Sequence, residues 1–215
     1  LILPEASLFS TKDCDVITHA RKRGYKVAIL TNGCLITEEA ARKASVLGIA
    51  DIQISLEGPP EIHDSIRGPG SFAAATEGAH LLVDAGVCVS ANMTLSRLNI
   101  DSIKETAKIA EGAGFSGIGF SRLVPCGRGE KLLASLLTPQ EVKTAYEKAL
   151  ALNSPSFEVA SGDPLAGVLS GFKPSPESEL ALSGCSAGFS GVTITSDGSV
   201  MPCRRIGIKI GNLSK

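Results

Sequence analysis

The chain has 215 residues and a formal net charge of −1, with 21 Lys and Arg against 22 Asp and Glu. This length suffices for one sizeable domain with a buried core. The charge balance excludes the basic excess of a nucleic-acid-binding protein, and no long apolar run predicts a membrane-spanning helix. Six cysteines in a chain this long and aliphatic favour reduced, cytoplasmic thiols or metal ligands over a disulfide framework.

Four apolar runs alternate with helical segments along the chain and predict the strands of a parallel sheet. Because these runs are largely continuous, we expect both faces of the sheet to be buried. A doubly wound open sheet and a (β/α) barrel both fit this α/β pattern, and in both the chemistry gathers at the carboxyl ends of the strands. The predicted strands, adjacent in this order, cover residues 26–31, 51–56, 87–95 and 117–124.

Three predicted helices begin at side chains suited to capping the first turn. Thr37 is an N-cap candidate before "EEAARKASV". Thr138 and Glu141 have the spacing of a capping box. Ser102 and Glu105 have the same spacing, so we expect a capping box there too.

Each predicted strand leads into a polar or glycine-rich segment. These segments are "TNG" at residues 31–33, "SLEGPP" at 55–60, "NMTLSRLN" at 92–99 and "RLVPCGRG" at 122–129. Their density of charge and glycine favours a functional site over plain turns.

The pattern changes after residue 152. Residues 153–183 are rich in Pro, Gly and Ser and read as a bridge. Residues 184–215 contain two alternating segments around "SDG", which predicts a hairpin. With its turn at residues 196–198, this hairpin places Cys203 opposite Gly191 or Val192, a few residues after Cys185.

Together, "TNG", "ISLEGPPEIHDSIRG", "RLVPCGRG" and the cysteine hairpin resemble radical S-adenosylmethionine (radical SAM) enzymes with a C-terminal SPASM or twitch extension. The resemblance runs along nearly the whole chain in the right order. It implies a partial (β/α)6 TIM-like barrel over residues 1–152 and the start of the extension at 184–215. In this family a 4Fe–4S cluster cleaves S-adenosylmethionine to a 5′-deoxyadenosyl radical, and the extension holds auxiliary 4Fe–4S clusters.

The resemblance also implies site residues. Ser55 with Glu57, and Asn92 with Thr94, share one side of their strands and are expected near the cofactor. The cofactor-binding prediction further includes Asn32, Arg122 and Leu123, and we expect Ser55, Glu57, Asn92 and Arg122 to line one cavity. Cys185 and Cys203 are predicted as two ligands of an auxiliary cluster, with a disulfide as the alternative.

Three family features are missing. No CxxxCxxC motif is present, the Gly-Gly-Glu-Pro segment is replaced by "LPEASLF", and the later cysteines of a full SPASM region do not occur. The simplest interpretation is a fragment cut at both ends, and the other is a degenerate relative. We therefore expect this chain alone to be inactive.

The remaining chemically active residue types are expected to be structural. Asp64 and Arg67 are predicted to form a local ion pair beside a structural His63. The other cysteines are predicted to behave as small buried hydrophobes; they are Cys14, Cys34, Cys88 and Cys126.

The leading functional hypothesis is a radical SAM enzyme that modifies a peptide or a tetrapyrrole of a haem-type pathway. It would receive electrons from ferredoxin or flavodoxin and would need neither nucleic acid nor membrane. The alternatives are a cluster-less relative that binds a peptide as a non-catalytic scaffold, and an ordinary barrel enzyme without clusters.

Overall fold

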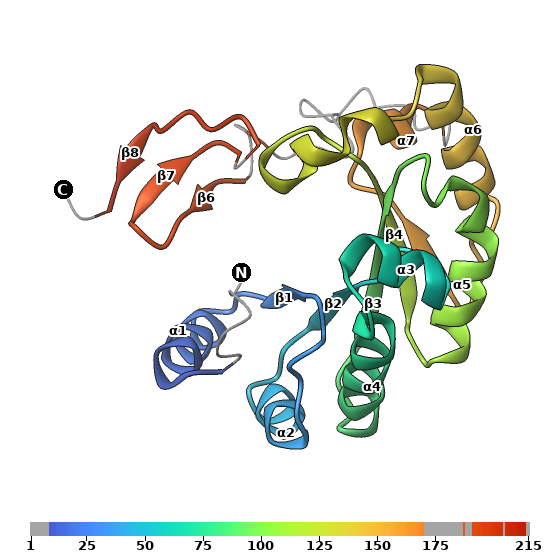
Figure 1. Cartoon of the computed structure of the whole chain (residues 1–215). Helices are drawn as coiled ribbons and strands as arrows, with labels where there is room; N and C mark the ends of the chain where they lie inside the picture. Colours follow the sequence, from blue (N-terminus) through green and yellow to red (C-terminus); the bar gives the residue numbers. More distant parts are fainter. Residues whose placement is uncertain (1–8, 170–186, 188–190, 204, 214–215) are drawn as a thin grey trace.

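The computed structural model describes residues 9–169, 187, 191–203 and 205–213. A five-stranded sheet forms the centre of the larger part, and helices follow one another along its outer side (Figure 1). A small three-stranded sheet near the C-terminus lies apart from these helices. This is the α/β partial barrel with an antiparallel addition that the sequence predicts.

The five strands of the large sheet pair in chain order and run parallel throughout. The predicted order and direction of the first four strands are therefore confirmed. The strands are β1 Ala28–Thr31, β2 Asp51–Ser55, β3 Val89–Leu95, β4 Gly117–Arg122 and β5 Glu158–Ala160. β5 falls within the segment predicted as a bridge and extends the sheet by one strand.

The helices that connect these strands carry alanine on their inner faces. Small side chains let a helix lie close to the sheet, and alanine is also the strongest helix former. Buried alanines of four helices join the core, among them Ala44, Ala79, Ala110 and Ala149. The helices are α1 Thr11–Lys22, α2 Glu38–Val46, α3 Pro60–Arg67, α4 Ser71–Asp84, α5 Ile103–Gly112, α6 Pro139–Leu150 and α7 Pro164–Leu169, with short 3₁₀ helices η2 Ile100–Ser102 and η3 Gly127–Ser135.

The expectation that both sheet faces are buried is wrong. Burial alternates strictly along β2 and β3. Side chains such as Ile54 and Met93 join the helix-covered core, whereas Asn92 and Thr94 lie half-buried on the other face. A barrel that is only partly closed leaves its inner face reachable, so polar side chains are tolerated there.

The predicted helix starts are confirmed, and the predicted side-chain caps form at two of the three positions. Thr37 caps α2, and Thr138 forms a capping box with Glu141 at α6. The capping box predicted at Ser102 and Glu105 is wrong, because η2 precedes α5 and the Ser102 hydroxyl donates to the Asn99 carbonyl instead.

The C-terminal sheet contains the predicted hairpin and one further strand. Strands β6 Thr193–Ile194, β7 Ser199–Met201 and β8 Gly211–Asn212 are antiparallel. Thr193 pairs with Met201, so the same register places Cys203 opposite Gly191, as predicted. Cys185 lies outside the described residues, so the predicted cysteine pair stays a prediction.

None of the cysteines that the structure describes is in a disulfide. Cys14 and Cys34 are half-buried, but Cys88 and Cys126 are exposed, so the prediction of buried thiols is wrong for the latter two. Cys88 precedes β3 and Cys126 precedes η3, where the chain is at the surface. None of the helices in the described part of the chain is long and apolar enough to cross a membrane.

Candidate functional site

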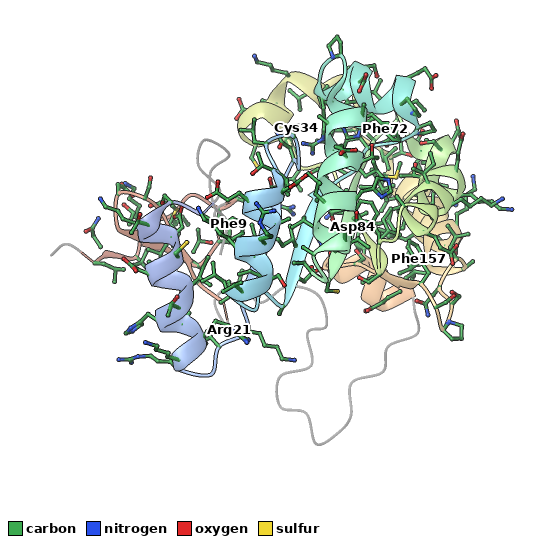
Figure 2. The ribbon with its side chains drawn as sticks, turned by 90° about the horizontal axis from the view of Figure 1, so that it is seen from below. Phe9, Arg21, Cys34, Phe72, Asp84 and Phe157 are labelled. Atoms are coloured by element: carbon green, nitrogen blue, oxygen red, sulfur yellow. The ribbon has the colours of Figure 1, made fainter. Side chains whose placement is uncertain are left out.

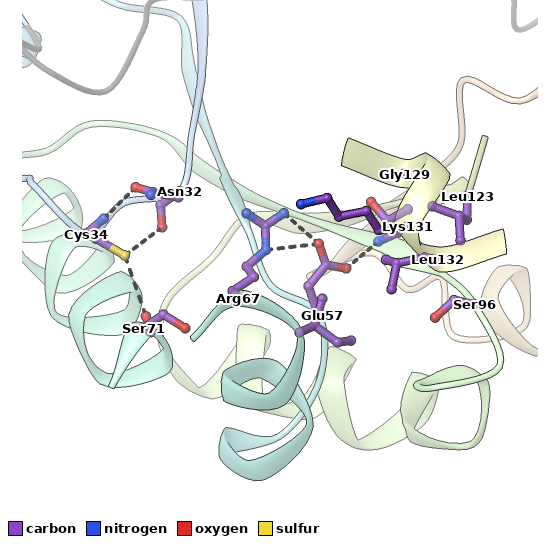
Figure 3. Close-up of a pocket in the computed structure, with 12 residues that line it drawn as sticks. Asn32, Cys34, Glu57, Arg67, Ser71, Ser96, Leu123, Gly129, Lys131 and Leu132 are labelled. Carbon is purple, nitrogen blue, oxygen red and sulfur yellow. Dashed lines mark hydrogen bonds and ion pairs between the residues drawn. The ribbon is translucent and has the colours of Figure 1, made fainter. Parts of the chain in front are cut away.

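A cavity of about 550 Å³ opens at the carboxyl ends of β1, β2 and β3, the size of a small-molecule site. Its walls come from strand ends, from α3 and α4, and from η3, which are far apart in the sequence (Figure 3). It is lined by Asn32, Cys34, Glu57, Ile66, Arg67, Ser71, Thr94, Ser96, Leu123, Gly129, Lys131 and Leu132.

The "TNG" loop after β1 forms one wall. The Gly33 N–H donates to the Thr31 hydroxyl, and the Cys34 N–H donates to Asn32 Oδ1 at 2.9 Å. Gly33 has φ +82° and packs against α4, where a Cβ at Gly78 would lie 2.4 Å from the Gly33 carbonyl oxygen. Only glycine at position 78 lets α4 come this close. Figure 2 shows Cys34 beside Phe72 at one end of α4 and Asp84 toward its other end.

A buried ion pair between Glu57 and Arg67 forms the floor of the cavity. Arg67 donates from Nε and Nη2 to Glu57 Oε1, at 3.0 and 2.6 Å. The Thr94 N–H donates to Glu57 Oε2 at 2.8 Å, so both carboxylate oxygens are engaged. The Glu57 side chain is 4% exposed and that of Arg67 is 27% exposed. A carboxylate this buried requires such partners, because desolvation would otherwise neutralise it.

The predicted ion pair between Asp64 and Arg67 is wrong. Asp64 accepts hydrogen bonds from the backbone N–H groups of Gly70 and Phe72, at 2.7 and 2.8 Å, at the start of α4. These bonds hold the pKa of Asp64 below its usual value. Arg67 lies at the end of α3 and turns to Glu57 instead.

His63 is structural, as predicted. The imidazole is buried and accepts the Glu57 N–H at Nδ1, at 3.1 Å. Its ring meets Phe72 edge to face, with ring centroids 5.8 Å apart. Burial, together with the charge of Arg67, lowers the pKa of His63 to about 4.

The cavity has an excess of positive charge. Glu57 neutralises Arg67, whereas Lys131 forms no ion pair with any residue that the structure describes. Figure 3 shows Lys131 reaching from η3 toward the Arg67 guanidinium. Serine, threonine and asparagine side chains surround these two cations. The geometry suits a small polar ligand with an anionic group.

Four of the predicted cofactor-binding residues line this cavity: Asn32, Glu57, Thr94 and Leu123. The expectation that Ser55, Glu57, Asn92 and Arg122 share one cavity does not hold here, because only Glu57 of the four lines it. Ser55 pairs with Asn92 across β2 and β3, and the Asn92 amide donates to the Ser121 hydroxyl at 3.4 Å. These side chains lie farther down the inner face of the sheet.

Arg122 is held by a different cluster. Its Nε donates to Asp163 Oδ2 at 2.9 Å, and the Tyr146 hydroxyl donates to the same oxygen at 3.1 Å. Tyr146 is fully buried on α6, and burial raises its pKa to about 12. Strand alternation places Arg122 on the side of Phe120, opposite Ser121, so it faces the helix layer. Its role toward a cofactor stays a prediction.

Sequence reasoning missed the cationic half of the cavity. The sequence predicts a local, structural role for Arg67, and Lys131 lies two residues after the glycine-rich "GRG" segment. The charge density of "IHDSIRG" and "CGRGEK" was the available signal. Nothing in either segment indicates that the two side chains converge.

The described residues do not fit an iron–sulfur cluster. No group of three or more Cys, His, Asp or Glu side chains within the described ranges could hold a metal ion. The cavity contains one cysteine, Cys34, whose thiol contacts the carbonyl oxygens of Asn32 and Ser71 at 3.8 Å.

Comparison with known proteins identifies the family. Residues 5–110 match the model of the radical SAM superfamily. The chain belongs to the radical SAM superfamily. This radical SAM chain is 34% identical over 138 residues to the AdoMet-dependent heme synthase of Oleidesulfovibrio alaskensis, covering 63% of the chain and 34% of that protein. It is 32% identical over 165 residues to the mycofactocin maturase MftC of Mycolicibacterium smegmatis, covering 73% of the chain and 42% of the maturase.

Solved radical SAM structures share the fold at low sequence identity. SuiB of Streptococcus suis, bound to its precursor peptide SuiA, superposes with a TM-score of 0.74 at 13% identity, over 93% of this chain and 47% of SuiB. Native anSMEcpe with AdoMet and the Kp18Cys peptide gives a TM-score of 0.64 at 21% identity, over 94% of this chain and 60% of that one. The chain thus spans between about a third and three fifths of these relatives.

Proposed function

We propose that the protein acts as a radical SAM enzyme and that this chain supplies its S-adenosylmethionine pocket. The observation that supports this proposal is the cationic cavity at the strand ends of a radical SAM chain. S-adenosylmethionine has one carboxylate, which suits Arg67 and Lys131. Its ribose hydroxyls suit polar groups such as Asn32, Ser71 and Ser96.

The chain's own residues bind and orient the cofactor in this proposal. Arg67 and Lys131 hold the carboxylate, and the buried floor beneath Arg67 keeps water from that side of the pocket. When bound to an iron–sulfur cluster, the cofactor supplies a 5′-deoxyadenosyl radical. The described cysteines do not fit that cluster. A CxxxCxxC motif outside this sequence would provide it, with electrons from a ferredoxin or flavodoxin in the cytoplasm.

The C-terminal sheet supports an auxiliary-cluster role for Cys203. This cysteine is half-buried at the open end of the β6–β7 hairpin, and the Arg205 N–H donates to its sulfur at 3.4 Å. N–H donors to a thiolate sulfur are typical of iron–sulfur sites. We propose Cys203, with Cys185, as ligands of an auxiliary 4Fe–4S cluster.

The substrate is proposed to be a peptide or a tetrapyrrole of a haem-type pathway. The sequence relatives include heme synthases and the maturase MftC, and the structural relatives include SuiB with a bound precursor peptide. The second candidate function is a peptide-binding scaffold without a cluster.

Calorimetric titration of the 215-residue chain with S-adenosylmethionine tests the pocket. We expect saturable binding, weakened about tenfold or more by Arg67→Gln, because a charge-assisted hydrogen bond contributes about 1.5–3 kcal/mol. Arg42→Gln is the matched control, since the Arg42 side chain is exposed on the outer face of α2. Peptide binding without any S-adenosylmethionine binding would favour the scaffold, and an unchanged affinity in Arg67→Gln would remove this pocket from the proposal.

A further inference from the structure

Both the side chain and the backbone of Glu57 form hydrogen bonds with other residues of the protein. Oε1 accepts two hydrogen bonds from Arg67, and Oε2 accepts one from the Thr94 N–H. Its own N–H donates to His63 Nδ1, and its carbonyl oxygen accepts from the Asn99 amide at 3.0 Å. The backbone and side chain of Glu57 are therefore fixed by partners from α3, β3 and the segment before η2.

The Asn99 amide strengthens this arrangement, because it joins two strand ends. Asn99 Nδ2 donates to the carbonyl oxygens of both Glu57 and Thr94, each at 3.0 Å. Its Oδ1 accepts the Ser96 N–H at 2.9 Å. Asn99 is 1% exposed. The loops after β2 and β3 are thus tied together directly beneath the cavity.

Arg67 is the cationic member of this network that lines the cavity, where it lies beside the Glu57 carboxylate. Nε and Nη2 are occupied by Glu57, and Nη1 forms no hydrogen bond with the residues described in the structure. Two bonds to one carboxylate fix the plane of the guanidinium, which otherwise rotates freely on a long side chain. Figure 3 shows the guanidinium beside Glu57 and facing Lys131.

We propose that Glu57 is a positioning residue that holds Arg67 in place for the carboxylate of S-adenosylmethionine and makes no contact with the ligand. This inference rests on the proposed function, and it revises the prediction that Glu57 itself binds the cofactor. The side chain is 4% exposed, and three of its acceptor positions are filled. Arg67 fills both acceptor positions of Oε1 and the Thr94 N–H fills one of Oε2, so only one position of Oε2 is left.

A thermodynamic cycle between protein and ligand tests the assignment. The 215-residue chain is titrated with S-adenosylmethionine and with its decarboxylated analogue, which lacks the group that Arg67 would meet. We expect Glu57→Gln to weaken binding of S-adenosylmethionine about 10-fold or more and to change the affinity for the analogue less than about 2-fold. The double variant Glu57→Gln/Arg67→Gln should bind S-adenosylmethionine no more weakly than Arg67→Gln alone. Glu38→Gln, which breaks the exposed pair with Arg42, is the matched control.

Two results of this cycle would overturn the proposal. Equal weakening of both ligands by Glu57→Gln would mean that Glu57 contacts a part of the ligand other than the carboxylate. Additive losses in the double variant would mean that Glu57 and Arg67 act separately.

If the chain does not bind S-adenosylmethionine, the proposed function is contradicted, but positioning of Arg67 by Glu57 can still be tested by a measurement without ligand. We expect the Arg67 Nε–H signal in ¹⁵N NMR spectra to be protected from solvent exchange and to lose that protection in Glu57→Gln. An unprotected signal in the native chain, or unchanged protection in the variant, contradicts positioning by Glu57. If Glu57→Gln does not fold, Glu57→Asp keeps the charge on a shorter side chain and should reduce the protection only partly.

Discussion

The imidazole of His63 works in this protein as an uncharged hydrogen-bond acceptor. Nδ1 accepts the Glu57 N–H, so the ring must carry its proton on Nε2, and a second proton on Nδ1 would break the bond. The ring is 1% exposed and packs against Phe72. The charge of Arg67 nearby adds to the cost of a cationic ring. The floor of the cavity therefore depends on a neutral histidine.

We predict a pH-dependent stability that originates at His63. Its pKa is about 4 in the folded chain, below the usual 6.5, so the unfolded chain binds more protons between these values. Stability contributed by this residue is complete above about pH 6.5, falls as the pH is lowered toward about 4, and is then lost, on the order of 3 kcal/mol in all. Urea unfolding of the native chain and His63→Asn across pH 4–7 measures the difference.

Comparison with that variant isolates His63 from other titrating groups. Burial raises the pKa of Asp51, which makes the folded state gain stability as the pH falls, the opposite direction. Asp51 is present in both chains, so its contribution cancels. Equal pH slopes for the native chain and His63→Asn would contradict the prediction.

At the scale of elements, the start of α6 is fastened to the end of β3. Thr138 and Glu141 cap the helix, and Glu141 also accepts hydrogen bonds from Arg97 Nε and Nη2. These bonds and the backbone donors of Thr138 lower the pKa of Glu141 to about 2. The Arg97 N–H additionally donates to the Ser135 carbonyl at 2.9 Å. The loop after β3, which borders the cavity, is thereby attached to both η3 and α6.

Thr138→Ala should destabilise the chain by about 1 kcal/mol, because the first turn of α6 loses its side-chain acceptor. Thr76→Ala is the matched control. Thr76 lies inside α4, where its hydroxyl bonds back to the carbonyl oxygens of Phe72 and Ala73, and its replacement should shift stability by less than about 0.5 kcal/mol. Urea denaturation midpoints measure both. Equal effects of the two substitutions would show that the cap contributes nothing specific.

At the scale of the whole molecule, the chain combines a cofactor-sized cavity with described cysteines that do not fit a cluster. We predict that the 215-residue chain binds S-adenosylmethionine but forms no 5′-deoxyadenosine, even after anaerobic iron–sulfur reconstitution. Three closely spaced thiolates are needed for a cluster with an open iron. Liquid chromatography with mass detection measures the product, and a radical SAM protein with an intact CxxxCxxC motif is the positive control. Product formed by this chain would refute the prediction.

The sequence by itself determined the elements and their order. Apolar runs rich in Val and Ile became β1 to β4, and capping residues such as Thr37 and Thr138 mark where helices begin. These signals are local, acting within a turn or a strand. The hairpin register around "SDG" is likewise set by a short turn. Four of the seven predicted cofactor-binding positions also line the cavity, because parallel strands must end at one edge.

Only the tertiary structure determined which charged side chains form ion pairs with one another. From the sequence, Arg67 could pair with Asp64, three positions away on the same helix, or with Glu57 in the preceding loop. In the structure Arg67 pairs with Glu57, because the Asp64 carboxylate accepts hydrogen bonds from the first turn of α4. Lys131 reaches the same cavity from η3, and Arg122 turns to Asp163 on the helix side. Such contacts join segments distant in the chain. Their geometry depends on how the sheet curves and how closely α4 packs, neither of which a local sequence pattern encodes.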